Sequence, residues 1–231
     1  MKRILVLLMA LHLVMLASSA LAGWEIVDSN GGRTFISDGW VKEAPEEGDG
    51  WMAMDFSRGM ILIVNPESRI YAESSLDEFC EVMDFLTELS RDAMAKSEGD
   101  DRPGSKPKVK VEKGGQKTIA GLSSDQYKIY VDGAFHEEVW LTRDSNLIKE
   151  LGTPENRRKA FACFSFDEVQ SSPAYVDIIS AGWVMESTDA EGEIDSDATQ
   201  VRKKEFSDSE FKAPDGYEKT SVGKAMGMGT N

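Results

Sequence analysis

WMAMDFSRGMILIVNPESRIY, residues 51–71, is the stretch from which most of the fold can be predicted, because it contains three short strands joined by two turns. Gly59 and the Asn65-Pro66 pair supply the backbone conformations that tight turns need. The middle strand, residues 60–64, is apolar at every position, whereas a strand with one solvated face alternates. We therefore expect both faces of this strand to be covered, by protein or by a bound ligand.

Turn signals on both sides of this stretch extend the pattern of short antiparallel strands. Asp38-Gly39 is typical of a two-residue hairpin, as are Gly114-Gly115 and Asp132-Gly133. Residues 43–50 and 188–197 are polar and acidic, and we expect both segments to be loops. The expected strands are residues 24–28, 33–37, 108–112, 116–120, 124–131, 135–142, 183–187 and 199–206.

Two helices are expected between groups of strands. Ser75 and Glu78 form a capping-box pattern at the start of residues 75–96, whose apolar stripe includes Cys80. Thr153-Pro154 is a typical start for a second helix, which carries Cys163. The order of elements predicts an α+β fold in which helices cover one face of a large curved antiparallel sheet.

The N-terminus predicts export. Residues 1–22 have a positive start, an apolar core and an Ala-Leu-Ala site, so we expect a signal peptide cleaved after Ala22 and a periplasmic protein. A membrane anchor is the alternative, but the apolar run is short for a span, and we expect no retained transmembrane segment. We expect one domain over residues 23–222 and a disordered tail over residues 223–231.

Charge and cysteine content limit the possible partners. Net charge is −15, and loss of Lys2 and Arg3 takes it to −17, which argues against nucleic-acid binding and favours a basic protein partner. In an oxidising compartment Cys80 and Cys163 are expected to form a disulfide, although two buried thiols are the alternative.

No residue is predicted to be catalytic, and we expect no cofactor and no metal. His136 is the one histidine after residue 22, so a zinc site is disfavoured, and an exposed strand histidine is the simpler interpretation than a general base. Glu193, Asp195 and Asp197 have a spacing that resembles calcium ligands, but they lack the glycine and closing glutamate of an EF-hand loop. A solvated acidic loop explains them better.

The strongest remaining signal is apolar. Flexible methionines in neighbouring strands suit a wall that contacts ligands of variable shape, although an ordinary core gives the same pattern. The candidates for an apolar cavity are Met52, Met54, Phe56, Met60, Leu62 and Val64, together with Trp40 and Trp140.

Three motifs resemble a known family. They are TIAG at residues 118–121 followed by Ser124 and Tyr127, EVWLT at 138–142, and Phe206 with FKAPDGY at 211–217. The chain resembles the exported bacterial family named domain of unknown function 4412, which is itself similar to the lipoprotein carriers LolA and LolB. This resemblance implies a half-barrel with helices on its concave face and a cavity for acyl chains. Ser124 stands where family members often carry a cysteine, and Arg33 and Arg58 do not match the arginine contact of the carriers.

These observations leave three hypotheses. The first is a non-enzymatic periplasmic protein that binds a lipid or a lipoprotein acyl chain in a cavity between sheet and helices. The second is an envelope interaction or sensor module with a packed core, whose acidic surface binds a basic protein. The third and least favoured is a hydrolase that uses His136. The sequence does not predict an oligomeric state.

Overall fold

The computed structural model describes residues 21–44, 50–98, 106–165 and 168–228. The described strands are β1 (Leu21–Asp28), β2 (Arg33–Ser37), β3 (Trp40–Ala44), β4 (Trp51–Asp55), β5 (Met60–Asn65), β6 (Ile70–Ser75), β7 (Val109–Ile119), β8 (Leu122–Val131), β9 (Ala134–Thr142), β10 (Trp183–Asp189), β11 (Ile194–Phe206) and β12 (Glu218–Lys219). They form one sheet in the order β12-β6-β5-β4-β3-β2-β1-β11-β10-β9-β8-β7. The β12–β6 pair is parallel and the other pairs are antiparallel.

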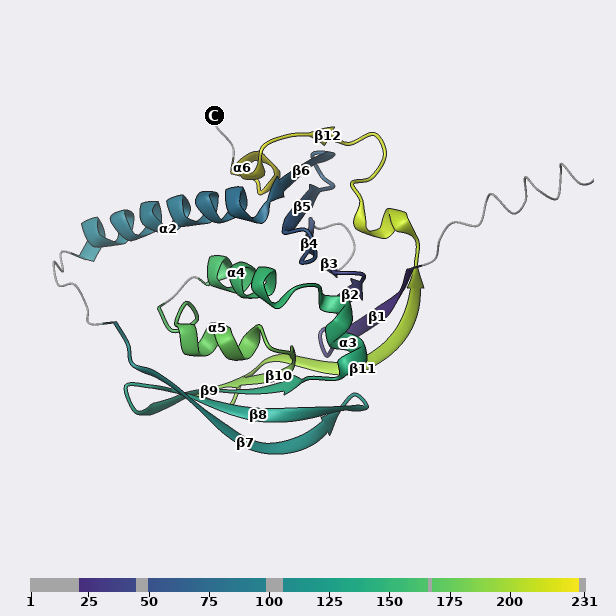
Figure 1. Cartoon of the computed structure of the whole chain (residues 1–231). Coiled ribbons are helices and arrows are strands. Elements are labelled where there is room, and N and C mark those ends of the chain that lie inside the picture. Colours follow the sequence, from purple (N-terminus) through teal and green to yellow (C-terminus); the bar gives the residue numbers. More distant parts are fainter. Residues whose placement is uncertain (1–20, 45–49, 99–105, 166–167, 229–231) are drawn as a thin grey trace, which may run out of the picture.

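The described helices are α2 (Leu76–Glu98), α3 (Ser145–Ile148), α4 (Pro154–Phe164), α5 (Pro173–Ile179) and α6 (Val222–Ala225), with 3-10 turns η1 (Lys149–Leu151) and η2 (Asp208–Phe211). Figure 1 shows that the open sheet curves around α4 and α5, while α2 runs across the side of β5 and β6. The fold is therefore α+β with a curved, mostly antiparallel sheet, as the sequence predicts. Within the described residues, no helix is long and apolar enough to cross a membrane.

Both faces of β5 are covered by protein, which confirms the prediction from its continuous apolar sequence. Ile61 and Ile63 belong to the main core, together with Phe79 of α2. Leu62 and Val64 face the opposite way and pack in a cluster with Tyr217, from the segment that follows β11. The second apolar face of β5 is therefore covered by a chain segment about 150 residues away in sequence.

The helix starts follow their sequence signals. The Ser75 Oγ accepts a hydrogen bond from the Glu78 N–H at 3.2 Å, and the Glu78 carboxylate accepts one from the Ser75 N–H at 3.2 Å. Thr153 caps α4 through its Oγ1, which accepts from the Asn156 N–H at 3.3 Å. The predicted disulfide is confirmed: Cys80 of α2 is bonded to Cys163 of α4, with Cα atoms 5.2 Å apart.

Two predictions are wrong, one of a turn and one of a loop. Gly114 and Gly115 lie inside β7 at a register irregularity, where the Gln126 side chain accepts from the Gly115 N–H at 3.0 Å. The chain reverses instead at Ala120-Gly121, whose φ angles of 47° and 87° suit a tight hairpin. The expected loop at residues 188–197 is largely a hairpin, because β10 and β11 continue through it and reverse near Gly192. Asp195 occupies an exposed strand position there, while Glu191 and Glu193 are exposed at the turn.

The two ends of the expected domain also differ from prediction. The disordered tail predicted from Gly223 is wrong for residues 223–228, because α6 buries Val222 and Ala225 against β5 and β6. These two residues are three apart on one helical face, which is enough to anchor a single turn. The expected signal peptide lies mostly outside the described residues. Cleavage after Ala22 would remove two residues of β1, including the Ala22 carbonyl that accepts from the Ser37 hydroxyl at 3.2 Å.

Candidate functional site: a cavity inside the curved sheet

A cavity of about 840 Å³, partly open to solvent, lies between the inner face of the sheet and the helices α4 and α6. It falls in the size range of sites that bind small molecules. More than half of its lining residues are apolar. The lining consists of Ile26, Asp28, Gly32, Arg33, Thr34, Glu43, Ala44, Gly50, Trp51, Met52, Ile63, Val64, Asn65, Phe161, Gly182, Trp183, Val184, Ser196, Ala198, Ala225 and Met226.

One wall of the cavity is a single row of side chains that crosses five strands. The strand registers pair each member with the next, in the order Ile26, Thr34, Glu43, Met52 and Ile63. Directly paired residues point to the same face of a sheet, so the five side chains form one continuous strip. The middle of this strip is polar and its two ends are apolar.

The opposite side of the cavity comes from elements that are distant in sequence. Phe161 of α4, Trp183 of β10 and Ala225 of α6 all line it. The helix α4 is held in place by the Cys80–Cys163 disulfide and by a contact between the Phe79 and Phe164 rings, whose centroids are 5.0 Å apart. The disulfide thus joins α2 to the helix that carries Phe161, so these two helices cannot separate while it is intact.

Three charged residues border the cavity: Asp28, Arg33 and Glu43. The Asp28 carboxylate accepts hydrogen bonds from the Asn30 and Gly32 N–H groups at 2.9 and 2.8 Å. The Arg33 guanidinium lies 3.8 Å from Glu25. Glu43 has no hydrogen-bond or ion-pair partner among the described residues. Desolvation by the surrounding protein raises its pKa above the ordinary value of 4.5, although the side chain stays accessible to solvent.

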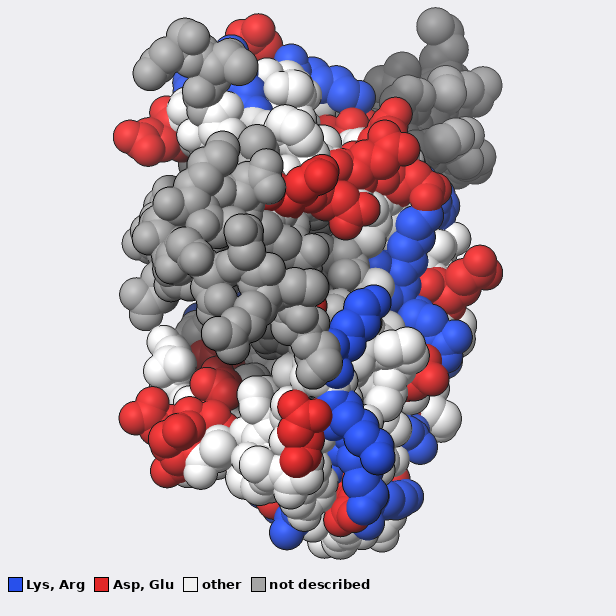
Figure 2. All heavy atoms as spheres, turned by 90° about the vertical axis from the view of Figure 1, so that its left-hand side faces the viewer, with Lys and Arg blue, Asp and Glu red and all other residues white. Residues whose placement is uncertain are grey.

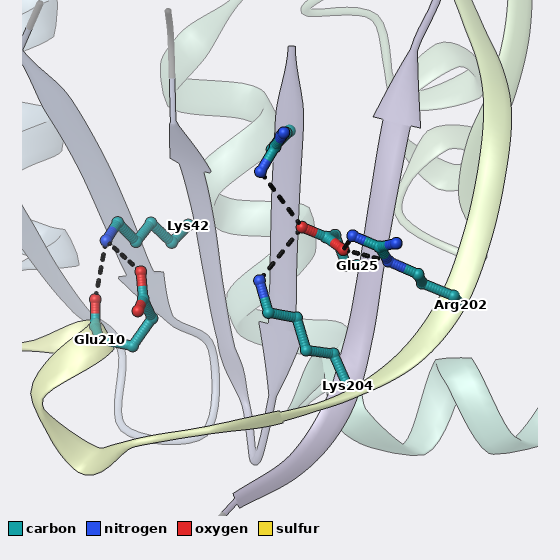
Figure 3. A network of polar contacts seen from close by, with 6 residues as sticks. Glu25, Lys42, Arg202, Lys204 and Glu210 are labelled. Carbon is teal, nitrogen blue, oxygen red and sulfur yellow. Dashed lines mark hydrogen bonds and ion pairs between the residues drawn. The ribbon is translucent and has the colours of Figure 1, made fainter. Parts of the chain in front are cut away.

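The outer face of the sheet carries a second carboxylate, Glu25, which is paired with cations and has a lowered pKa. Figure 3 shows Glu25 of β1 among cationic side chains from β2 and β11. Glu25 is fully buried, Arg202 forms a close ion pair with it, and Lys204 lies 3.2 Å away. Burial alone would raise the pKa of Glu25, but hydrogen bonds from Arg202 and Lys204 outweigh it, so the net pKa is below 4.5.

The outer face also has a smaller hollow, of about 590 Å³, under the segment that follows β11. Trp40 and Leu62 line it, together with Phe211. Beside it, the Lys42 ammonium binds the side chain and the carbonyl of Glu210 at 2.8 and 2.9 Å, as drawn in Figure 3. These contacts fix the covering segment to the sheet.

The structure separates the eight apolar residues that the sequence predicts for one cavity. Met52 lines the large cavity, and Val64 borders it although its side chain packs in the outer cluster, whereas Trp40 and Leu62 line the outer hollow. The other four line neither space. Met54 and Phe56 belong to the main core, Met60 is half-buried in the pair with Asp55, and Trp140 packs under Lys117, whose Nζ lies 4.1 Å from the ring centroid.

Sequence reasoning missed Glu43 and Thr34, which the structure places at the centre of the cavity wall. Glu43 begins the polar segment 43–50, which we expected to be a loop, but it and Ala44 are the last two residues of β3. The available signal was the regular hairpin geometry after Asp38-Gly39, which predicts that β3 runs as far as its partner β2.

The other polar candidates do not assemble a site. His136 is exposed in β9. Glu193 and Asp195 are exposed, while Asp197 accepts a hydrogen bond from the Ser29 N–H at 3.2 Å. Among the residues that the structure describes, no group of three His, Cys, Asp or Glu side chains is placed to hold a metal ion.

No protein-family model matches the chain, and no curated protein is significantly similar to it. The resemblance to the domain of unknown function 4412 and to LolA and LolB therefore stays a prediction.

Proposed function

We propose that the chain is a non-enzymatic envelope protein that binds the acyl chain of a lipid or of a lipoprotein inside the curved sheet. The observation that supports this proposal is the cavity of about 840 Å³ with mainly apolar walls between the sheet and α4. Transfer of an aliphatic chain from water into such a space gains about 0.8 kcal/mol for each buried methylene group. A periplasmic location, with residues 1–22 as a signal peptide, is part of the same proposal.

The proposal predicts that the cavity exchanges apolar ligands. Native mass spectrometry of gently extracted protein should show bound lipid, and the delipidated protein should bind Nile red, with dodecanol displacing the dye. A protein that is isolated empty and takes up no dye would contradict the proposal.

A matched pair of variants locates the binding. Ala198 of β11 lines the cavity and is buried, so Ala198→Phe places a ring in existing empty space. We expect it to reduce Nile red uptake severalfold with little loss of thermal stability. Ala134→Phe is the control, because Ala134 is exposed at the start of β9 and does not line the cavity. Equal dye uptake by both variants would place the binding elsewhere.

A second candidate function, binding of a basic envelope protein, rests on the surface of α2. The exposed residues Asp77, Glu81, Asp84 and Glu88 repeat along one side of this helix. Figure 2 shows acidic side chains gathered in the upper half of that view, beside a line of Lys and Arg side chains. Such a surface supports salt-sensitive association. Binding of a lysine-rich peptide should weaken in high salt and in the variant Asp84→Lys with Glu88→Lys.

A further inference from the structure

Among the charged residues that line the cavity, Glu43 is the one for which the described part of the chain supplies no hydrogen-bond or ion-pair partner. Glu43 stands at the centre of the cross-strand strip, between Thr34 and Met52. Of the other two charged residues that border the cavity, Asp28 is bound by backbone N–H groups and Arg33 directs its guanidinium to Glu25 on the outer face. An unpaired carboxylate in a partly desolvated site costs free energy, which a ligand can recover by supplying the missing partner.

The geometry of the sheet directs Glu43 toward the cavity. Its register partners, Thr34 of β2 and Met52 of β4, line the same space, and directly paired residues point to one face of a sheet. The Glu43 side chain is exposed to solvent, and desolvation by the protein around it raises its pKa.

An ionised carboxylate only accepts hydrogen bonds, so a complementary ligand group must donate them. An ammonium group donates up to three and adds charge attraction, which makes it the strongest partner. A polar end that carries only negative charge, such as a fatty-acid carboxylate, would instead be repelled. The apolar neighbours Ile26 and Ile63, at the two ends of the strip, provide space for an aliphatic chain next to such a head group.

We propose that Glu43 is the anchor of the cavity for amphiphiles whose polar end carries a primary ammonium group. This inference rests on the proposed function, since it names the class of ligand that the same cavity binds. The ammonium can belong to an ethanolamine phospholipid or to the free amino group of a lipid-modified peptide, which share this chemistry.

The test compares three amphiphiles of equal chain length as competitors of Nile red: dodecylamine, dodecanol and laurate. Each is titrated into the wild-type protein, into Glu43→Gln, and into Glu205→Gln. Glu205 is an exposed acid of β11 outside the cavity, so its variant controls for the loss of one negative charge. Because glutamine has nearly the shape of glutamate, the cavity volume stays the same.

We expect dodecylamine to bind the wild type about tenfold more tightly than it binds Glu43→Gln, as for loss of a charge-assisted hydrogen bond. Laurate should change in the opposite direction, and dodecanol should change little. Glu205→Gln should behave as the wild type. Equal affinity of dodecylamine for the wild type and for Glu43→Gln would overturn the inference while dodecanol binding upheld the proposed function. Failure of all three amphiphiles would overturn both.

A pH titration provides a second readout. Dodecylamine stays cationic across the acid range, so its tenfold preference for the wild type should disappear as Glu43 becomes protonated. Because desolvation raises the pKa of Glu43, the loss should occur above pH 4.5. Asp28 and Arg33 remain in both proteins, so their titration cancels in the comparison. A preference that persisted below pH 4 would contradict the role of Glu43.

Lysophosphatidylethanolamine and a lipopeptide with a free amino group then distinguish the two sources. Each should lose affinity when its amine is acetylated, in the wild type and not in Glu43→Gln. The source with the larger difference is the better match to the cavity. Absence of any acetylation effect with both ligands would contradict the inference.

Discussion

Each face of the sheet carries a carboxylate in a strand, and the two carboxylates have opposite environments. On the outer face, Glu25 is fully buried and paired with Arg202 and Lys204, so its pKa is lowered. On the inner face, Glu43 borders a cavity, and desolvation raises its pKa because no partner in the described chain offsets it. The first arrangement stabilises the fold, whereas the second costs stability and leaves a site open for a ligand.

This difference follows from what covers each face. The segment after β11 lies on the outer face and is attached through Lys42 and Glu210. The inner face is covered by helices that are tied together by the Cys80–Cys163 disulfide and that leave a large space unfilled. The predictions below test whether the outer face serves structure and the inner face serves binding.

The largest expected effect is loss of the disulfide that holds the inner helices. The link spans 83 residues, so the double variant Cys80→Ser with Cys163→Ser should lose about 4–5 kcal/mol by the chain-entropy model. Urea unfolding measures the loss, and a reducing agent should lower the wild type to the level of the double variant. The rate of amide hydrogen exchange should increase more in α4 than in β1 and β2. Uniform acceleration in all three elements would argue against a specific role at the inner face.

The second largest effect is expected when side chains of similar size are truncated on opposite faces of two neighbouring strands. Leu62 is almost fully buried under the outer segment, so Leu62→Ala should cost about 3 kcal/mol. Met52 is only half-buried at the cavity, so Met52→Ala should cost about 1 kcal/mol. Nile red affinity should change in Met52→Ala and stay constant in Leu62→Ala. The reverse pattern would place the binding site on the outer face.

A third variant removes the outer carboxylate. Glu25→Gln deprives Arg202 and Lys204 of their partner and should cost about 2 kcal/mol at neutral pH, since both cations can still turn to solvent. Because the pKa of Glu25 is lowered by folding, its contribution is present above pH 4.5 and is lost as the pH falls through the folded-state pKa. Urea midpoints of the two proteins should therefore converge in acid. A constant difference at all pH values would mean that packing, rather than charge, is lost.

How much of this molecule the sequence predicts depends on the range of the interactions involved. The capping box at Ser75, the cap at Thr153 and the hairpin at Asp38-Gly39 are local, and each prediction is confirmed. The Gly114-Gly115 turn failed because a β-bulge and a hairpin use the same residues, and only pairing with the next strand distinguishes them. The Ala120-Gly121 reversal lacks the Asn or Asp that usually marks such turns.

The cavity could not be predicted residue by residue because it depends on register. Alternation along β5 sends Leu62 outward and Ile63 inward, but the sequence does not show which apolar neighbour stays uncovered. The segment that covers Leu62 comes from residues 211–217, which the sequence does not connect to β5. The central polar residue, Glu43, belongs to a stretch whose composition is typical of a loop.

The smallest expected effect is the most direct test of the comparison. Glu43→Gln should stabilise the empty protein at neutral pH, by at most about 1 kcal/mol because water in the cavity partly solvates the carboxylate. The sign follows from the raised pKa. The folded state holds the proton more tightly than the unfolded state, so the wild type loses stability as the pH rises from 4.5 through the folded-state pKa. The gain in stability of Glu43→Gln should therefore be complete well above that pKa and vanish below pH 4.5, as measured by thermal unfolding.

The control variant Glu205→Gln should show no such dependence on pH, because Glu205 is exposed outside the cavity. A Glu43→Gln protein that is less stable than the wild type at neutral pH would mean that Glu43 has a structural partner. The carboxylates on both faces would then stabilise the fold.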